Sequence, residues 1–470
     1  MNARGALGLV GMGLLVGAVA GWWARSAPPA PSPPGRADAP TPRSGPPHVV
    51  LVIGCTVRRD QIGVYGGHPR ATPFLDELAA TGVRFDDAVA AAPWTRAAST
   101  ALLTGRHPID LGMIEPGDGP NERALPSTAV TLAELLQAAG YQTLGTTANP
   151  NLNAVFGFAQ GFDDYLEVTA PWGQVGMIKV DGAEVVSGLL ASVDTHWDGA
   201  TPLYLQAMLI DAHEPRHAPM AAIEHLTSPD VPRRVALYRY NLRRFDESVR
   251  ALVDGLAARG VHDPLLVVVS DHGEGLLYPM HHGRGHGVFT YPSTVAMPWL
   301  MRGPGVGRGA VIDGVASQVD VMPTLLGVLG LSRPDDVGRD WSALVTEGGR
   351  TDRQVAYVDT WFQDASRVAS YDAELACHHD ATPAASGGLR PPTACYDRRV
   401  DPDAMQPLEP SPHGAIEGLL RWRAERVAAF EALGELGVVE VDNALREQLE
   451  ALGYAQGEGD DEKELKSPEP

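Results

Sequence analysis

The sequence predicts an α/β protein built on a mostly parallel central sheet flanked by helices. Two features indicate this fold class. Short apolar segments rich in valine and isoleucine alternate along the chain with longer segments of helical spacing. Several of these apolar segments end abruptly in polar residues, as strands do at the ligand-binding edge of such a sheet. With 470 residues and 44% apolar content, the chain can bury one large core with a smaller unit attached.

The first predicted element is a central strand at residues 48–54, a short apolar run with many β-branched side chains. A helix at 72–82 follows, with a glycine as its stop signal, and then a short strand at 83–85. The next helix, at 97–105, has its N-terminus near Thr95. Strand and helix therefore alternate from the start of the predicted fold.

The later elements continue this alternation. They are helices at 131–140, 233–260 and 319–329 and strands at 142–145, 203–210 and 265–270. The longest of them, the helix at 233–260, places Leu242, Phe245 and Val249 at helical spacing on one face. An amphipathic helix of this length is expected to cover one side of the sheet.

Three predicted strands end in groups that can carry chemistry. These are Cys55 and Thr56 after the first strand, Asp211 and His213 after the strand at 203–210, and Asp271 and His272 after the strand at 265–270. If the strands are parallel, their ends meet at one edge of the sheet. An adjacent carboxylate and imidazole there form a credible metal corner. The plainer alternative is an aspartate that caps the following helix beside an incidental histidine.

The charge of the chain argues against a nucleic-acid partner. Lys and Arg number 37 against 58 Asp and Glu, which gives a formal net charge of -21. No basic block is present to offset the repulsion of phosphates. The acidity indicates little else about partners.

The N-terminal residues 1–26 have the layout of a targeting segment. A basic residue lies on each side of an uncharged apolar run at 6–23. This run suits either a cleaved signal peptide or a membrane anchor with Trp22 and Trp23 at the interface. Both alternatives predict export to the periplasm or another extracytoplasmic space. Residues 27–47 are rich in Pro, Ser and Ala and predict a semi-rigid linker.

The three cysteines divide into a late pair and a single residue. In an exported protein Cys377 and Cys395 are expected to form a disulfide. Cys55 is then left as an unpaired thiol at the end of the first strand.

A series of short blocks occurs in order between residues 48 and 331. They are Cys55-Thr56-Val57-Arg58-Arg59-Asp60, Pro93-Trp94-Thr95, Leu102-Leu103-Thr104-Gly105-Arg106, Ala148-Asn149-Pro150, Gly161-Phe162-Asp163, Asp211-Ala212-His213-Glu214-Pro215, Ser270-Asp271-His272-Gly273-Glu274, Gly285-His286-Gly287 and Val319-Asp320-Val321-Met322-Pro323-Thr324-Leu325. Together they resemble the sulfatase family of the alkaline phosphatase superfamily. The C-terminal stretch from Leu445 to Tyr454 is also similar to many members.

The resemblance implies an enzyme that splits sulfate or phosphate esters. It also implies a metal ion at the edge of the sheet and a nucleophile at the start of a helix. A divalent cation and a helix N-terminus both stabilise negative charge on transferring oxygens, so the arrangement suits the reaction.

The nucleophile position departs from the family pattern. The family converts a Cys or Ser within a C/S-x-P-x-R motif to formylglycine, whereas the corresponding run here is Thr95-Arg96-Ala97-Ala98-Ser99. Threonine cannot undergo this conversion because its β-carbon carries a methyl group. Relatives in the wider superfamily use an unmodified Thr or Ser alkoxide that a metal activates. The resemblance therefore implies Thr95 as an unmodified nucleophile.

The second departure is Cys55, which stands where the family has a metal-binding aspartate. A thiolate is a good ligand for zinc and a poor one for the hard cations calcium and magnesium. We therefore expect one divalent metal held by Cys55, Asp271 and His272 next to Thr95. Zinc is favoured, with calcium or magnesium as alternatives. The competing interpretation makes Cys55 a small buried residue in a disabled site.

Four further residues match positions that contact substrate in the family. The resemblance implies His213 as a general acid near the leaving oxygen, and His286 as a contact of the bound anion. Asp211 and Asn149 are weaker candidates for substrate binding. For Asp211 the alternative is a purely structural role. His213 and His286 have loop or surface positions as their alternatives.

The residues divide into successive regions. Residues 48–350 are expected to form the catalytic domain and 351–455 a smaller C-terminal subdomain with an amphipathic helix at 415–436. The charged stretch at 456–470 predicts a disordered tail.

Three functions remain open from the sequence. The first is a hydrolase of sulfate or phosphate esters that uses Thr95. The second is a disabled sulfatase scaffold that binds anionic glycans or lipids in the cell envelope. The third is a membrane-tethered transferase that moves a phospho-headgroup. The expected partner in each is a sulfated or phosphorylated small molecule, glycan or lipid.

Overall fold

The computed structural model describes residues 45–118, 121–169, 179–227, 231–278, 284–362, 365–382, 393–433 and 437–454. The predicted targeting segment, nearly all of the linker and the predicted tail lie outside these ranges. Within them, no helix has both the length and the apolar character needed to cross a bilayer.

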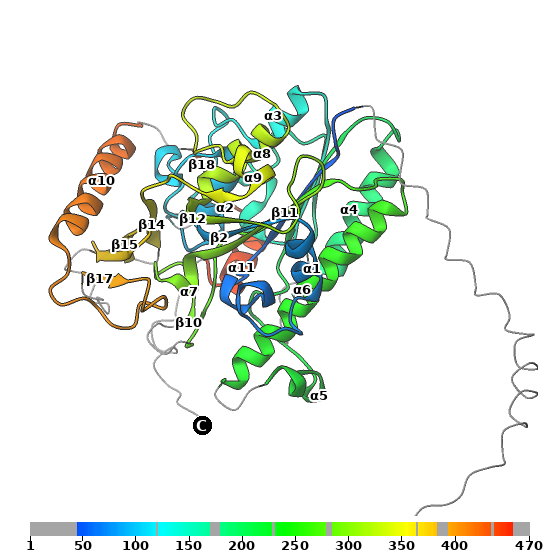
Figure 1. The fold of residues 1–470 in the computed structure, drawn as a ribbon. Coiled ribbons are helices and arrows are strands. Elements are labelled where there is room, and N and C mark those ends of the chain that lie inside the picture. The colour runs from blue at the N-terminus through cyan, green and yellow to red at the C-terminus, as the bar shows by residue number, and fades with distance from the viewer. Residues whose placement is uncertain are drawn as a thin grey trace, which may run out of the picture. The chain divides into compact units, whose positions relative to one another are not determined.

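In the described part of the chain, nine strands form one central sheet (Figure 1). In spatial order they are β13 (Gly349–Arg350), β12 (Ala310–Ser317), β2 (Val83–Val89), β11 (Ala296–Arg302), β8 (Leu265–Ser270), β1 (Val49–Gly54), β7 (Leu203–Leu209), β5 (Gln142–Thr147) and β6 (Asp164–Glu167). Strand β11 is antiparallel to both of its neighbours, and the other neighbouring pairs are parallel. The predicted mostly parallel sheet is confirmed.

Strands β1, β7 and β8 form the centre of this sheet and are buried along their whole length. Their runs of valine, leucine and isoleucine fit a strand that is covered on both faces. Strand β1 pairs in parallel with both others, in a register that places Gly54 opposite Leu209 and Ser270. The three strands therefore end together, and the residues after them start from one edge of the sheet.

Helices cover both faces. On one face, α1 (Pro73–Thr81), α4 (Gly182–His196) and α6 (Arg233–Ala257) pack together (Figure 1). On the other, α2 (Thr95–Thr104) packs against α8 (Val321–Val328). The amphipathic prediction for α6 is confirmed, because Leu242, Phe245 and Val249 are buried. Helix α3 (Leu132–Ala138) begins with a capping box formed by Thr131 and Glu134.

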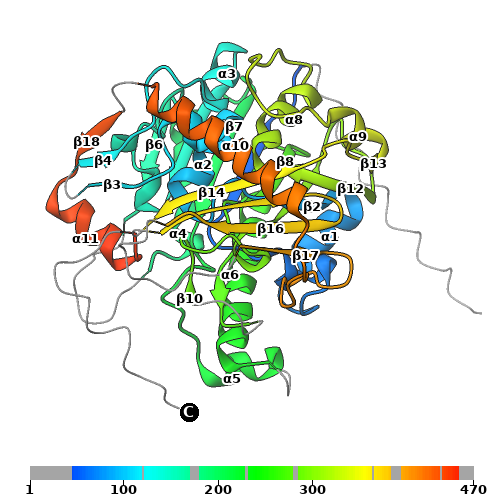
Figure 2. The same cartoon turned by 90° about the vertical axis from the view of Figure 1, so that its left-hand side faces the viewer.

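The C-terminal part forms a smaller antiparallel sheet. Its strands are β14 (Ala356–Phe362), β15 (Ala365–Tyr371), β16 (Leu375–Asp380) and β17 (Ala394–Asp397), and α10 (His413–Glu431) crosses it (Figure 2). The expected disulfide between Cys377 and Cys395 is confirmed and joins paired positions of β16 and β17. Helix α10 begins directly after a proline, slightly earlier than predicted, and ends before residue 436.

The last described part of the chain joins a separate three-stranded sheet. Strand β18 (Val438–Glu440) pairs with β4 (Asn121–Arg123), which pairs with β3 (Gly117–Asp118). Helix α11 (Asn443–Ala451) follows and buries Leu449. This path carries the last described residues to the edge of the central sheet where β1 and β8 end.

Candidate active site

The ends of β1 and β8 bring three predicted metal ligands together. Cys55 follows β1, and Asp271 and His272 follow β8, with all three side chains fully buried. One ligand atom from each lies within 4.8 Å of the others. The parallel pairing of the two strands is the cause, since it places Gly54 beside Ser270.

Thr95 is the first residue of α2 and faces this cluster. Its Oγ1 lies 3.7 Å from Cys55 Sγ and 3.2 Å from His272 Nε2. The backbone N–H groups in the first turn of a helix have no partner within the helix, and the helix dipole adds positive potential there. Thr95 therefore presents a hydroxyl at a position that favours negative charge.

Asn149 completes this side of the cluster. It precedes the short 3₁₀ helix η4 (Pro150–Leu152) and caps it, because Asn149 Oδ1 accepts from Asn151 N at 3.0 Å. The amide Nδ2 is thereby turned toward Cys55 Sγ at 3.3 Å and Thr95 Oγ1 at 3.4 Å. Of the substrate contacts expected from the sequence, Asn149 is thus next to the nucleophile position.

Both site imidazoles present a lone pair to the cluster. His272 Nδ1 lies 2.8 Å from Gly273 O, and His213 Nδ1 lies 2.5 Å from Glu214 O. Because a carbonyl only accepts, each Nδ1 carries the proton and each Nε2 does not. Burial lowers the pKa of His272 to about 4 and also lowers the pKa of His213 well below its ordinary value. Both rings are therefore neutral at pH 7.

The Asp271 carboxylate has one satisfied and one unsatisfied oxygen. Its Oδ1 accepts from Thr56 N at 3.0 Å and from His272 N at 2.6 Å. Its Oδ2 is buried without a hydrogen-bond partner among the described residues and lies 3.4 Å from His272 Nε2. The buried Asp271 Oδ2 thus lies beside the acceptor atom His272 Nε2, which is costly unless a cation binds there. The donor set fits a divalent metal.

The third donor, the Cys55 sulfur, indicates which metal fits. Burial raises the pKa of the Cys55 thiol, and the charge of Asp271 raises it further. A cation displaces such a proton when it binds a thiol, so the site would release a proton on loading. A thiolate, an imidazole and a carboxylate form a mixed donor set that zinc accepts and calcium does not.

His286 lies over the site as part of a charged network. Its ring centroid is 4.6 Å from that of His272 and 5.0 Å from that of His213. Its Nδ1 lies 3.4 Å from Glu274 Oε1, and Arg216 donates to Glu274 Oε2 at 2.6 Å. Although burial raises the pKa of Glu274, His286 and Arg216 lower it well below its usual range. Glu274 and Arg216, which the sequence reasoning missed, hold His286 in place.

Asp211 is the one predicted site residue that the structure places apart. Its Oδ1 accepts from Gly182 N at 3.1 Å, at the start of α4. Its backbone oxygen accepts from Lys179 Nζ, which also donates to His213 O at 2.7 Å. Among the described residues, no hydrogen bond joins the Asp211 side chain to the cluster around Thr95. Asp211 and Lys179 thus fix the loop that carries His213.

Tyr454 is a residue of the cluster that the sequence reasoning missed. Its hydroxyl lies 2.6 Å from Thr95 Oγ1 and 3.4 Å from His213 Nε2. Burial raises its pKa well above the ordinary value, and the charge of Asp271 raises it further, so the phenol is neutral. In the sequence, the stretch from Leu445 to Tyr454 is similar to family members, but no spacing signal connects it with Thr95.

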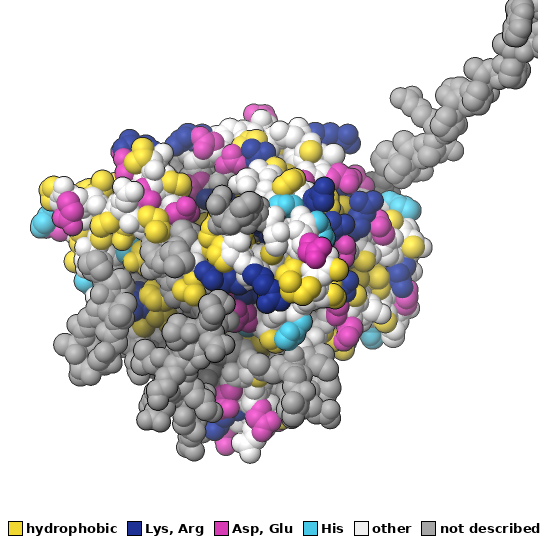
Figure 3. All heavy atoms as spheres, turned by 90° about the horizontal axis from the view of Figure 1, so that it is seen from below, with side chains coloured by type: hydrophobic (Ala, Val, Ile, Leu, Met, Phe, Trp, Pro, Cys, Tyr) yellow, Lys and Arg dark blue, Asp and Glu magenta, His cyan; other side chains and the backbone are white. Residues whose placement is uncertain are grey.

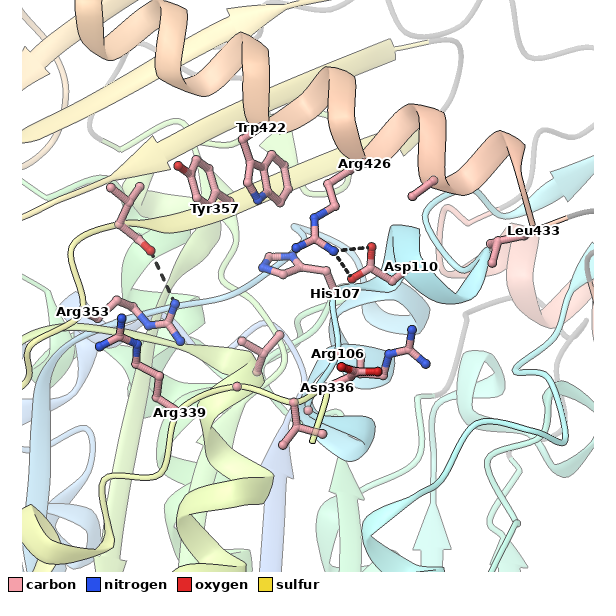
Figure 4. Close-up of a pocket in the computed structure, with 16 residues that line it drawn as sticks. Arg106, His107, Asp110, Asp336, Arg339, Arg353, Tyr357, Trp422, Arg426 and Leu433 are labelled. Carbon is pink, nitrogen blue, oxygen red and sulfur yellow. Dashed lines mark hydrogen bonds and ion pairs between the residues drawn. The ribbon is translucent and has the colours of Figure 1, made fainter. Parts of the chain in front are cut away.

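A separate cavity of about 680 Å³ lies at the other end of α2, between that helix and α10 (Figure 4). In Figure 4, Arg426 and Trp422 extend from α10 toward Asp110 and His107. Arg426 binds both oxygens of Asp110, at 2.8 and 2.7 Å, so its charge is already neutralised. None of the predicted site residues lines this cavity.

Comparisons with known proteins identify the family. A family model described as Sulfatase matches residues 47–331. The chain is 26% identical to an ulvan-active sulfatase of Formosa agariphila, over 64% of this chain and 65% of that protein. It is 28% identical to arylsulfatase A of Homo sapiens, over 76% of this chain and 82% of that one. The alignment thus spans just under two thirds of the first relative and more of the second.

Solved structures share the fold. A crystal structure of Ps i-CgsB in complex with k-i-k-neocarrahexaose superposes with a TM-score of 0.66 at 16% identity, covering 87% of this chain and 98% of that one. A phosphonate monoester hydrolase from Silicibacter pomeroyi gives a TM-score of 0.62 at 17% identity, and the superposition covers 85% of this chain and 96% of that one. At such identities the likeness concerns the fold alone.

Proposed function

The chain belongs to the sulfatase family of ester hydrolases, and we propose that it cleaves sulfate or phosphate esters with Thr95 as an unmodified nucleophile. One observation carries this proposal. The Thr95 hydroxyl, at the start of a buried helix, lies within 3.7 Å of two of the three side chains that could bind a divalent metal. No formylglycine is needed in such a site, because an alkoxide beside a cation is itself a nucleophile.

Cys55, Asp271 and His272 would hold the metal, and zinc suits them best. When bound, a zinc ion would stabilise negative charge on the Thr95 oxygen and on the transferring group. Asp271 Oδ2, which has no hydrogen-bond partner among the described residues and lies 3.4 Å from His272 Nε2, would gain a partner. The orphaned carboxylate oxygen is the feature that a hydrophobic, disabled site would not retain.

The remaining residues have distinct roles in the proposed reaction. The Thr95 oxygen forms a bond to sulfur or phosphorus while the bond to the leaving alcohol breaks. His213 first takes up the proton that Thr95 loses and then supplies it to the leaving oxygen, and water later splits the ester formed on Thr95. Asn149 Nδ2 is placed to donate to an oxygen of the transferring group, and His286 faces the same space.

Positively charged side chains on one face of the protein also favour an anionic ester as substrate. Although the whole chain has a formal net charge of -21, Lys and Arg side chains gather near the middle of the face seen in Figure 3. Such a local field raises the concentration of anions near the surface. The family relatives include an ulvan-active sulfatase, and Ps i-CgsB was crystallised with a neocarrahexaose. We therefore propose a sulfated or phosphorylated small molecule or glycan as substrate.

The proposal is tested by metal analysis and turnover. The purified protein is loaded with zinc, and hydrolysis of an aryl sulfate and an aryl phosphate is measured for wild type and Thr95→Ala. The matched control is Thr104→Ala, in the same helix, whose hydroxyl donates to Thr100 O at 2.6 Å and lies away from the site. We expect Thr95→Ala to lose on the order of 10⁴-fold or more in kcat and Thr104→Ala to stay near wild type. Equal rates for wild type and Thr95→Ala would remove Thr95 from the mechanism.

A second function, anion binding without turnover, is favoured by one observation. Burial and Asp271 raise the pKa of the Cys55 thiol, and a neutral thiol is a weak metal ligand. This alternative requires that the purified protein bind no metal and hydrolyse neither ester. Stoichiometric zinc with enzyme-like turnover would eliminate it.

A further inference from the structure

We propose that Tyr454 is a catalytic residue that carries the proton of Thr95 to His213. This inference rests on the proposed function, because it assigns the group that activates the nucleophile. The Tyr454 oxygen is the only described atom that bridges the two residues, at 2.6 Å from Thr95 Oγ1 and 3.4 Å from His213 Nε2.

The direction of these hydrogen bonds follows from the position of the proton on His213. His213 Nδ1 donates to Glu214 O, so His213 Nε2 is an acceptor. The Tyr454 hydroxyl therefore donates to His213 Nε2. Its oxygen then accepts from the Thr95 hydroxyl, at 2.6 Å. The two contacts together give a proton leaving Thr95 a path through Tyr454 to His213.

The other neighbours of Thr95 do not offer this path. His272 Nε2 and Cys55 Sγ are the atoms proposed to hold the metal, so their lone pairs are committed. Asn149 faces Thr95 with its NH₂ group, which only donates, while its oxygen is bound to Asn151 N at 3.0 Å. Among the described residues in contact with Thr95 Oγ1, Tyr454 is thus the remaining proton acceptor.

The step balances without any further reagent. As Thr95 Oγ1 bonds to sulfur or phosphorus, its proton passes to the Tyr454 oxygen and the Tyr454 proton passes to His213 Nε2. The resulting imidazolium protonates the leaving oxygen as the ester bond breaks, which returns His213 to neutrality. In the second half, water loses a proton to His213 as it attacks. That proton returns through Tyr454 to Thr95 when the bond to Thr95 breaks.

The backbone holds Tyr454 firmly enough for this role. Gly453 adopts a left-handed conformation with φ of 80°, and Tyr454 N donates to Leu449 O at 2.8 Å. This turn closes α11 and points the Tyr454 ring back toward α2. The ring is buried and meets Phe362 edge-on, with centroids 6.4 Å apart. A phenylalanine at position 454 keeps this packing and removes only the hydroxyl.

The kinetic test compares Tyr454→Phe with Tyr65→Phe, which removes a hydroxyl bonded to Phe85 O away from the site. With zinc-loaded protein, we expect Tyr454→Phe to lower kcat about 100-fold or more with KM changed little, and to alter the solvent deuterium isotope effect. Tyr65→Phe should match wild type in both. A Tyr454→Phe enzyme as fast as wild type, or faster, would overturn the relay, and a faster one would mark Tyr454 as an obstruction.

A second measurement does not depend on turnover. Nitrogen NMR of the histidine side chains reports which ring nitrogen of His213 carries the proton. We expect the Nδ1-protonated form, with the Nε2 resonance shifted in Tyr454→Phe and unchanged in Tyr65→Phe. A proton on Nε2, or no shift in Tyr454→Phe, would contradict the path.

The two proposals fail in different ways. Turnover that Thr95→Ala abolishes and Tyr454→Phe leaves intact would overturn the relay alone. Absence of turnover in the wild type would overturn the proposed function and, with it, the catalytic role of Tyr454. The NMR result would then still decide whether the hydrogen-bonded chain exists.

Discussion

Arg96, the residue after the proposed nucleophile, is expected to be a major source of stability for this end of α2. Its guanidinium is 1% exposed and donates to Glu122 Oε2 at 2.7 Å, to Pro116 O at 3.0 Å and to Asn151 Oδ1 at 3.2 Å. It also lies over the Phe156 ring, 3.9 Å from the centroid. Replacement by methionine would keep the apolar stem and leave a buried carboxylate without its partner.

The cost follows from that uncompensated charge. Breaking a buried ion pair at one partner costs about 3–5 kcal/mol, whereas replacing both partners by apolar residues is often close to neutral. We therefore expect Arg96→Met to lower the free energy of unfolding by about 3–5 kcal/mol. The double variant Arg96→Met with Glu122→Leu should recover most of the loss. The assay is denaturant unfolding of the four members of this double-mutant cycle.

An exposed pair provides the control. Arg259 and Asp194 have side chains 28% and 55% exposed, so Arg259→Met should cost no more than about 1 kcal/mol. If Arg96→Met costs as little as this, or if the double variant is less stable than the single one by a further few kcal/mol, the burial argument is wrong.

Three further outcomes are expected. Replacing Cys55 by Asp should weaken zinc binding by about two orders of magnitude, since one thiolate contributes roughly 3 kcal/mol to the binding free energy. The same change should add calcium binding, and a competition titration measures both affinities. Burial raises the pKa of Asp246 to about 6, so the folded state holds this proton more tightly than the unfolded chain. The stability of Asp246→Asn relative to wild type should then rise by about 2 kcal/mol between pH 4 and pH 7, and a pH-independent difference would refute this. Gly54→Ala should lower stability by about 1–3 kcal/mol in thermal unfolding. The reason is that a Cβ there would lie 2.6 Å from Val57 Cγ2 and 2.8 Å from Phe245 Cζ. Unchanged stability would show that these two side chains move to make room for it.

The central part of the fold was predictable because its strands are buried on both faces. Such strands need continuous runs of β-branched and aliphatic residues, and the runs at β1, β7 and β8 are visible in the sequence. The polar residues that follow two of them, Cys55 and the pair Asp271 and His272, meet as expected because the strands are parallel and in register.

The rest of the site was harder to predict from the sequence, for physical reasons. Asp211 also follows a buried strand, yet its carboxylate binds Gly182 N, because position after a strand does not fix where a side chain points. Tyr454 meets Thr95 across 359 positions of sequence and follows no strand, so neither periodicity nor spacing connects the two. Glu274 and Arg216 form an ion pair whose burial is known only from the packed structure.

The central claim is that Cys55, Asp271 and His272 form a metal centre beside Thr95. X-ray absorption at the zinc edge of the loaded protein tests it most directly, because sulfur and lighter ligands scatter differently. We expect one sulfur ligand at about 2.3 Å together with nitrogen and oxygen ligands at about 2.0–2.2 Å, and loss of the sulfur in Cys55→Ser. A spectrum without sulfur in the wild type, or a protein that retains no zinc, would contradict the claim.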